Sequence, residues 1–98
     1  MTTMRVLITG GLGVNGAWVT RELVDRGIET VVIDNREDFS LLGARYVERI
    51  VFEKVDIRIR DHILDVLERH TISAVGHMSA AVRHQAIYLC LIHILRLL

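Results

Sequence analysis

The glycine-rich stretch 9–16 constrains the fold of this chain more than any other segment. Three of its four glycines have the spacing of a phosphate-binding turn between an apolar run and a segment with helical periodicity: Gly10, Gly13 and Gly16. Because glycine lacks a Cβ atom and adopts positive φ, such a turn leads a buried strand into a helix and leaves room for a pyrophosphate. The first N–H groups of the helix would then face the anion. Asp34 ends the next apolar run about 20 residues on, where nucleotide-binding βαβ units carry an acid.

Hydrophobic periodicity around this turn indicates a strand, a helix and a second strand. Residues 5–9 are β-branched and apolar without alternation, as in a strand buried on both faces. Residues 14–26 have the pattern of an amphipathic helix, whose inward face is formed by Ala17, Thr20, Leu23 and Val24. Gly27 is placed to end this helix, and residues 30–33 form the next buried strand. This order predicts a right-handed βαβ unit with parallel strands.

The patterns after the second strand extend the unit to a small α/β sheet. We expect, in chain order, a polar connection over 35–45 with a turn of helix around 39–42, a third strand over 48–55, a helix over 60–70 and a fourth strand over 72–78. Gly76 interrupts the fourth strand, at a point where another group comes close to the backbone. The sequence therefore predicts an α/β, Rossmann-like parallel sheet of about four strands in the order 3-2-1-4, flanked by helices.

The C-terminal stretch differs in character from the rest. Residues 80–98 have high helix propensity and are apolar on almost every face, so we divide the chain into a Rossmann half, 1–82, and an apolar C-terminal helix, 83–98. This helix is too short and carries too many ionisable residues to span a bilayer. We expect it to cover the open edge of the sheet or to join copies of the chain into a homo-oligomer.

Composition narrows the class of partner. The 98 residues suit one small domain, and twelve acids balance twelve bases to a net charge of zero. This balance gives no electrostatic footprint for nucleic acid. The single cysteine, Cys90, cannot form an internal disulfide, and the histidines lack ligand spacing, so we expect no metal site. No secretory apolar segment follows Met1, and we expect a cytoplasmic protein.

Four landmarks in chain order resemble the N-terminal part of one enzyme family. They are the glycine turn 9–16, the pair 34–35, the triplet 56–58 and the run 75–81. Together they are similar to the extended short-chain dehydrogenases, the family of NAD-dependent nucleotide-sugar epimerases and dehydratases. The resemblance covers about residues 4–82, and it implies a fold that is truncated relative to the full family fold.

The resemblance implies a cofactor-binding set whose members are Gly10, Gly13, Val14, Asn15, Gly16, Asp34, Asn35, Asp56, Ile57, Met78, Ser79 and Ala80. The three glycines, together with Val14 and Asn15, would hold the pyrophosphate. Asp34 would accept hydrogen bonds from the ribose hydroxyls and repel a 2′-phosphate, which favours NAD over NADP, whereas Arg36 weighs against that preference. Asp56 would accept a hydrogen bond from the adenine amine while Ile57 packs on the ring. The last three residues would line the floor of the groove.

Three of these landmark residues have more than one interpretation. Asp56 either contacts adenine or caps the helix near residue 60. Asn15 is polar where relatives are apolar, so it is either exposed or in contact with phosphate. His77 is either a packed histidine at the end of a strand or a catalytic base, and the packed role is the commoner one.

The catalytic pattern of the resembled family is missing from this sequence. That pattern is Tyr-x-x-x-Lys, and the residues four places after Tyr46 and Tyr88 are Ile50 and Ile92. We therefore expect no catalytic residue in the chain. Two hypotheses follow: the NAD-binding portion of an epimerase- or dehydratase-like oxidoreductase that is not catalytic alone, or a non-catalytic Rossmann-like homo-oligomeric module with weak or no nucleotide binding.

Overall fold

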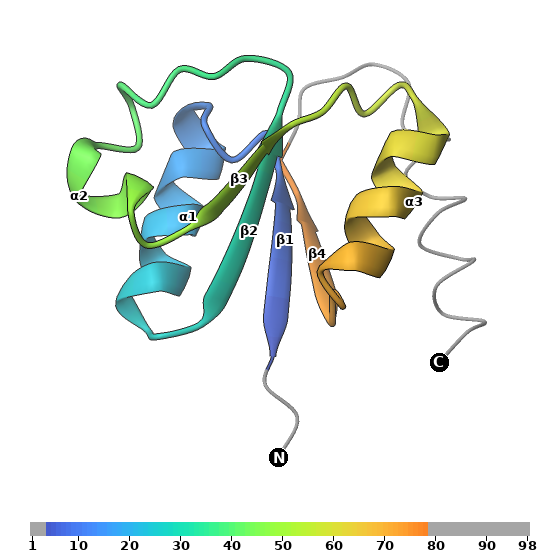
Figure 1. Cartoon of the computed structure of the whole chain (residues 1–98). Coiled ribbons are helices and arrows are strands. Elements are labelled where there is room, and N and C mark those ends of the chain that lie inside the picture. Colours follow the sequence, from blue (N-terminus) through green and yellow to red (C-terminus); the bar gives the residue numbers. More distant parts are fainter. Residues whose placement is uncertain (1–3, 79–98) are drawn as a thin grey trace.

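The computed structural model describes residues 4–78, which form four strands and three helices in alternation (Figure 1). In chain order these are β1 (Arg5–Thr9), α1 (Val14–Asp25), β2 (Glu29–Asp34), α2 (Ala44–Val47), β3 (Val51–Lys54), α3 (Arg60–Arg69) and β4 (Ala74–His77). The expected apolar helix 83–98, and Ser79 and Ala80 of the expected site, lie outside the described residues.

The strands form one parallel sheet in the order β3-β2-β1-β4, which confirms the predicted topology. In the register of the central pair, Val6 lies opposite Thr30 and Ile8 opposite Val32. Figure 1 shows α1 and α2 on one face of the sheet and α3 on the other. The order reverses at β1, whose neighbours are β2 and β4, so the carboxyl ends of β1 and β4 flank the crevice where open α/β sheets bind ligands.

Each face of the sheet has its own hydrophobic core. The core on the α3 side joins Leu7, Val31 and Ile33 of the sheet to the inward residues of α3, which are Ile63, Val66 and Leu67. The core on the α1 side joins Val6, Ile8 and Val32 to Ala17 and Leu42. Strands β1 and β2 are thus buried on both faces, as their unbroken apolar runs predict.

The connection from β2 to β3 differs from the sequence-based prediction in two ways. The helical turn expected around 39–42 is present, since the N–H of Gly43 donates to the carbonyl oxygen of Phe39 at 3.0 Å, but the helix α2, at Ala44–Val47, was not expected. Leu42 is buried, with 1% of its surface exposed, and Gly43 then adopts φ 95° and begins the helix. The third strand is shorter than the predicted 48–55, because the N–H of Arg49 donates to the carbonyl of Tyr46 and prolongs the helical turn.

The end of α1 follows the sequence-based prediction. Gly27 adopts φ 75°, and its N–H donates to the carbonyl oxygen of Val24 at 2.9 Å. The N–H of Ile28 reaches the carbonyl of Leu23, which completes a two-bond C-cap. Thr71 is the one described non-glycine residue with positive φ, in the turn after α3. No helix among the described residues is long and apolar enough to cross a membrane.

The expected close approach at Gly76 is confirmed, and the neighbour is Ile8 on β1. A Cβ atom at position 76 would lie 2.7 Å from Cδ1 of Ile8.

We expect Gly76→Ala to lower the free energy of unfolding by about 1–2 kcal/mol, since Ile8 is 1% exposed and has little room to move. In an Ile8→Val background, which lacks that Cδ1 atom, the same change should cost less than about 0.5 kcal/mol in urea unfolding. Equal costs in both backgrounds would contradict this contact.

An ion-pair cluster ties β3 to the end of α3. Glu53 Oε1 accepts a hydrogen bond from Arg69 Nη2 at 2.6 Å, and its Oε2 contacts His70 Nε2. Partial burial raises the pKa of Glu53, but the hydrogen bonds from Arg69 and His70 outweigh this effect and hold that pKa below its ordinary value. The cluster therefore favours the folded state when Glu53 is ionised.

This cluster predicts a dependence of stability on pH. Because the folded pKa of Glu53 is lowered, its contribution is present above the unfolded pKa of about 4.3 and is lost as pH falls through the folded pKa. We expect Glu53→Gln to reduce the free energy of unfolding by about 1 kcal/mol or less at pH 7, and by almost nothing at pH 3. Urea unfolding at the two pH values measures the difference. A penalty that does not shrink at pH 3 would show that the charge of Glu53 is not involved.

Candidate functional site

The glycine turn joins β1 to α1 and lies against the end of β2. Gly10 adopts φ 67°, and its N–H donates to the carbonyl of Ile33 at 2.9 Å. The Gly10 carbonyl accepts the N–H of Gly13 at 3.2 Å, which closes the turn. No side chain caps the N-terminus of α1, where Gly13 is the N-cap. An anion could therefore bind at this helix end without displacing a protein side chain.

The glycines of this turn meet different steric demands. A Cβ atom at Gly16 would lie 1.9 Å from the carbonyl oxygen of Gly10, so only glycine fits where the helix crosses the turn. A Cβ at Gly11 would lie 2.5 Å from Cγ1 of Val32. At Gly13, by contrast, the nearest protein atom would be 3.6 Å away, an ordinary contact. Protein packing therefore does not require glycine at position 13.

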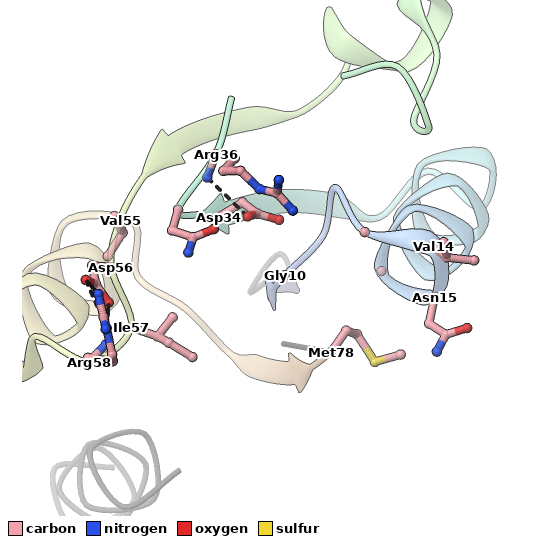
Figure 2. Close-up of a pocket in the computed structure, with 13 residues that line it drawn as sticks. Gly10, Val14, Asn15, Asp34, Arg36, Val55, Asp56, Ile57, Arg58 and Met78 are labelled. Atoms are coloured by element: carbon pink, nitrogen blue, oxygen red, sulfur yellow. Dashed lines mark hydrogen bonds and ion pairs between the residues drawn. The ribbon is translucent and has the colours of Figure 1, made fainter. Parts of the chain in front are cut away.

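A cavity of about 460 Å³ opens beside this turn, at the carboxyl ends of the strands (Figure 2). Its volume lies in the range of ligand pockets, about 300–1,000 Å³. The cavity is lined by Gly10, Gly13, Val14, Asn15, Gly16, Asp34, Asn35, Arg36, Val55, Asp56, Ile57, Arg58 and Met78. Every member of the sequence-predicted set that the structure describes is among them. The fold thus brings four landmarks that are distant in the sequence around one cavity.

Asp34 links the end of β2 to the glycine turn. Its Oδ2 accepts the N–H of Leu12 at 3.3 Å, and its Oδ1 accepts the N–H of Arg36 at 3.3 Å. Each oxygen keeps a lone pair beyond these backbone contacts, so the carboxylate can still accept hydrogen bonds from two hydroxyl groups. A vicinal diol bound in the cavity would present such a pair.

Asp56 also lines the cavity, and Arg58 donates hydrogen bonds to its carboxylate. Arg58 Nη2 donates to Oδ2 at 2.7 Å, and both Nε and the backbone N–H of Arg58 donate to Oδ1 at 3.0 Å. These hydrogen bonds lower the pKa of Asp56 to about 2, so the carboxylate is ionised at neutral pH. The interpretation of Asp56 as a helix cap is wrong, because the N-cap of α3 is Ile59 and no side chain caps it.

Val14, Asn15 and Met78 lie on two sides of the cavity. Asn15 is exposed and lines it, as does Val14, so the polar side chain of Asn15 does not enter the core. At the other side, the N–H of Met78 donates to the carbonyl of Thr9, which holds Met78 at the cavity beside β1. Figure 2 shows these residues on the rim around Gly10.

His77 pairs with the buried end of β1. Its Nδ1 lies 2.6 Å from Oγ1 of Thr9, whose side chain is fully buried. His77 does not line the cavity. This geometry fits the packed histidine better than the catalytic base. Within residues 4–78, no cluster of three or more His, Cys, Asp or Glu side chains could hold a metal ion.

Sequence reasoning left two of the cavity's residues out and gave one only a secondary role. Val55 precedes the triplet 56–58, and its apolar side chain does not mark it as a ligand, whereas Arg58 belongs to the triplet but was given no role. Arg36 follows the predicted pair 34–35, and the structure places it on the cavity wall. All three residues are immediate neighbours of predicted site residues, and this adjacency is the sequence signal that identifies them.

The parallel order β3-β2-β1-β4, the glycine turn before α1 and the acid at the end of β2 define a Rossmann-like nucleotide-binding half-fold. The sequence model of the NAD dependent epimerase/dehydratase family matches residues 6–88. The chain belongs to this family.

The chain is also similar to individual proteins and to solved structures. The chain is 38% identical over 80 residues to the bifunctional protein GAL10 of Candida maltosa, covering 76% of this chain and 52% of that protein. It is 33% identical over 81 residues to the UDP-glucose 4-epimerase of Klebsiella pneumoniae, covering 78% and 58%. The solved Thermus thermophilus UDP-glucose 4-epimerase in complex with NAD superposes with a TM-score of 0.66 at 30% identity, covering 80% of this chain and 24% of that one.

The chain therefore spans little more than half the length of these two curated relatives and about a quarter of the solved epimerase. The shared part contains the glycine turn and the strand ends that form the cavity. At Gly13 the cavity leaves space beside the helix N-terminus that a Cβ atom could occupy with no protein contact closer than 3.6 Å.

Proposed function

We propose that this chain binds NAD as the cofactor-binding part of an oxidoreductase that acts on nucleotide sugars. The observation that supports this most is the combination of the glycine turn, Asp34 and Asp56 around one cavity. The helix N-terminus at Gly13 would hold the pyrophosphate, Asp34 would accept the adenosine ribose hydroxyls, and Asp56 would accept the adenine amine. Asp34 favours NAD over NADP, because a carboxylate repels a 2′-phosphate.

The cofactor would supply hydride chemistry when bound, and this chain's own residues would bind and orient it. We propose that the chain does not turn over nucleotide sugars alone. The support is in the sequence, where neither Tyr46 nor Tyr88 is followed at the fourth position by lysine, and Lys54 is the only lysine. Without that pair no tyrosine of this sequence has a lysine at the fourth position after it, the arrangement that the family's catalytic pattern requires.

Calorimetric titration of the full chain with NAD tests the binding proposal. We expect Asp34→Asn to weaken NAD binding about tenfold or more, because an amide replaces a charged acceptor, while its oxygen can still accept the N–H of Leu12. The matched control is Glu37→Gln, which makes the same charge change at an exposed neighbour that does not line the cavity. Equal affinities for wild type and Asp34→Asn, or no NAD binding by wild type, would refute the proposal.

The second candidate is a non-catalytic Rossmann-like module that functions as a homo-oligomer. The observation that favours it is that β3 and β4, the outer strands of the described sheet, each pair on one side only. We propose that the C-terminal segment 83–98 or a second copy of the chain covers such an edge. Absence of NAD binding in the titration above would leave this candidate in place of the first.

A further inference from the structure

One flank of α1 carries an apolar groove that no helix among residues 4–78 covers. The opposite flank faces the connection between β2 and β3, where the hydroxyl of Tyr46 on α2 donates to Oδ2 of Asp25 at 3.0 Å. Val19 and Leu23 project from the other side of α1, toward the edge of the sheet that β4 forms. Figure 1 shows α1 and α2 as the labelled helices on this face, so the β4 side of α1 is open in the described part of the chain.

This α1 groove has a volume of about 500 Å³. Its lining residues are Trp18, Val19, Glu22, Leu23, Arg26 and Ile28. The aliphatic members pack against the core on the α1 side and are only half-buried. Trp18 exposes 69% of its surface, and Arg21 lies over one face of its ring, 5.9 Å from the centroid. Aliphatic side chains beside an exposed indole form an apolar patch of the kind that marks an interaction site.

The C-terminal segment 83–98 is long enough to cover this groove. The described chain ends at Met78, which lines the same cavity as Val14 at the start of α1, so the linker 79–82 has a short distance to bridge. Sixteen residues in a helix extend about 24 Å, whereas the twelve residues of α1 extend about 18 Å. A helix that begins near residue 83 can therefore follow α1 from its first turn to its last.

The sequence of this segment also suits an apolar groove. Ile87, Leu91, Ile94 and Leu98 recur at the i, i+4, i+7, i+11 spacing, which places them in one stripe of a helix. A short linker gives the segment an effective concentration of about millimolar at its own groove, which exceeds that of a second copy in a micromolar solution. The segment of the same chain is therefore the favoured occupant.

We propose that residues 83–98 form a helix that packs into the α1 groove of the same chain and covers Trp18. The contact removes the apolar stripe of the segment and the aliphatic floor of the groove from water together. It lies on the β4 side of α1, outside the cavity beside the glycine turn, and it does not depend on dinucleotide binding.

The only tryptophan and the only cysteine of the chain, Trp18 and Cys90, report this contact in the full chain. A nitroxide attached to Cys90 quenches tryptophan fluorescence only at short range. We expect the label to lower Trp18 emission at least about twofold, because a segment on so short a linker is docked in most molecules. Val19→Asp, which introduces a charge into the groove, should remove most of the quenching. Leu41→Asp changes an exposed apolar residue outside the groove and should not.

Two further samples test the other occupants. In the double variant Trp18→Phe, Glu68→Trp the reporter lies on the exposed face of α3, and we expect little quenching there. Quenching at position 68 and not at 18 would overturn the inference and assign the segment to the α3 side. Labelled Trp18→Phe chains mixed with unlabelled wild type should leave Trp18 emission unchanged. Quenching in that mixture would show that a second copy supplies the segment, contrary to the inference.

Unlabelled protein checks that the nitroxide itself does not displace the segment. We expect Leu91→Asp to increase the quenching of Trp18 by acrylamide at least about twofold, since a charge in the apolar stripe disfavours docking. Trp18 that is equally accessible in wild type and in Leu91→Asp would refute the contact, whatever the labelled samples show. Circular dichroism of both proteins verifies that the fold is retained.

Discussion

Gly16→Ala is expected to destabilise the fold by about 3 kcal/mol or more, a large part of the stability of a small domain. The added Cβ atom would lie 1.9 Å from the carbonyl oxygen of Gly10 and 2.8 Å from the Cα atom of Gly11. Both neighbours are backbone, so relief requires α1 to move away from the turn. That movement would disturb the packing of Ala17 against the sheet.

Urea unfolding followed by circular dichroism measures this effect. The matched control is Gly13→Ala in the same turn, where φ is −75° and the nearest protein atom to a Cβ is 3.6 Å away. We expect that control to stay within about 1 kcal/mol of wild type, because the backbone conformation suits any residue. A Gly16→Ala protein as stable as the control would show that α1 does not approach the turn as closely as described.

The βαβ unit could be predicted from the sequence because its signals are local. The apolar run of β1, the glycine turn and the C-cap at Gly27 each fix backbone conformation within a few residues, and the structure confirms all three. Strand order then follows from short parallel connections, which leave few arrangements. The sequence predicts that another group comes close to the backbone at Gly76. It does not predict that this group is Ile8, which is distant in the sequence.

The connection between β2 and β3 could not be predicted, because tertiary contacts determine it. Leu42 is buried against the α1 side of the sheet, which fixes where the loop turns inward and lets α2 begin after Gly43. Arg21 on α1 stabilises this arrangement by donating to the carbonyl oxygen of Leu41 at 2.6 Å. Such contacts leave no periodicity in a polar segment, so the sequence pattern did not predict α2.

The candidate site, like the fold, has a part that the sequence predicts and a part that it does not. Its members could be predicted because parallel strands present their carboxyl ends at one edge of the sheet, which brings positions 10, 34 and 56 together. The pairing of Asp56 with Arg58 could not be predicted, since an acid before a helix is equally suited to capping. The pairing leaves α3 without a side-chain cap and holds an ionised carboxylate at the cavity. The geometry of the site therefore excludes the capping role of Asp56.

A side chain introduced at Gly13 is expected to weaken ligand binding without changing stability to a similar degree. We expect Gly13→Ala to weaken NAD binding about tenfold and Gly13→Val at least about a hundredfold, as measured by calorimetric titration of the full chain. Gly13 lines the cavity, and a Cβ atom there would meet no protein atom closer than 3.6 Å, so an added side chain takes up space that the pyrophosphate would need. The two substitutions should differ in affinity far more than in stability.

The contrast between Gly16 and Gly13 makes this result diagnostic. If the turn served the fold alone, a side chain at Gly13 would have no effect, since nothing in the described protein competes for that space. A graded loss of NAD affinity from glycine to alanine to valine, with unfolding free energies within about 1 kcal/mol of one another, requires the dinucleotide to approach the backbone there. Affinity unchanged in Gly13→Val would mean that NAD, if it binds, does so away from the N-terminus of α1.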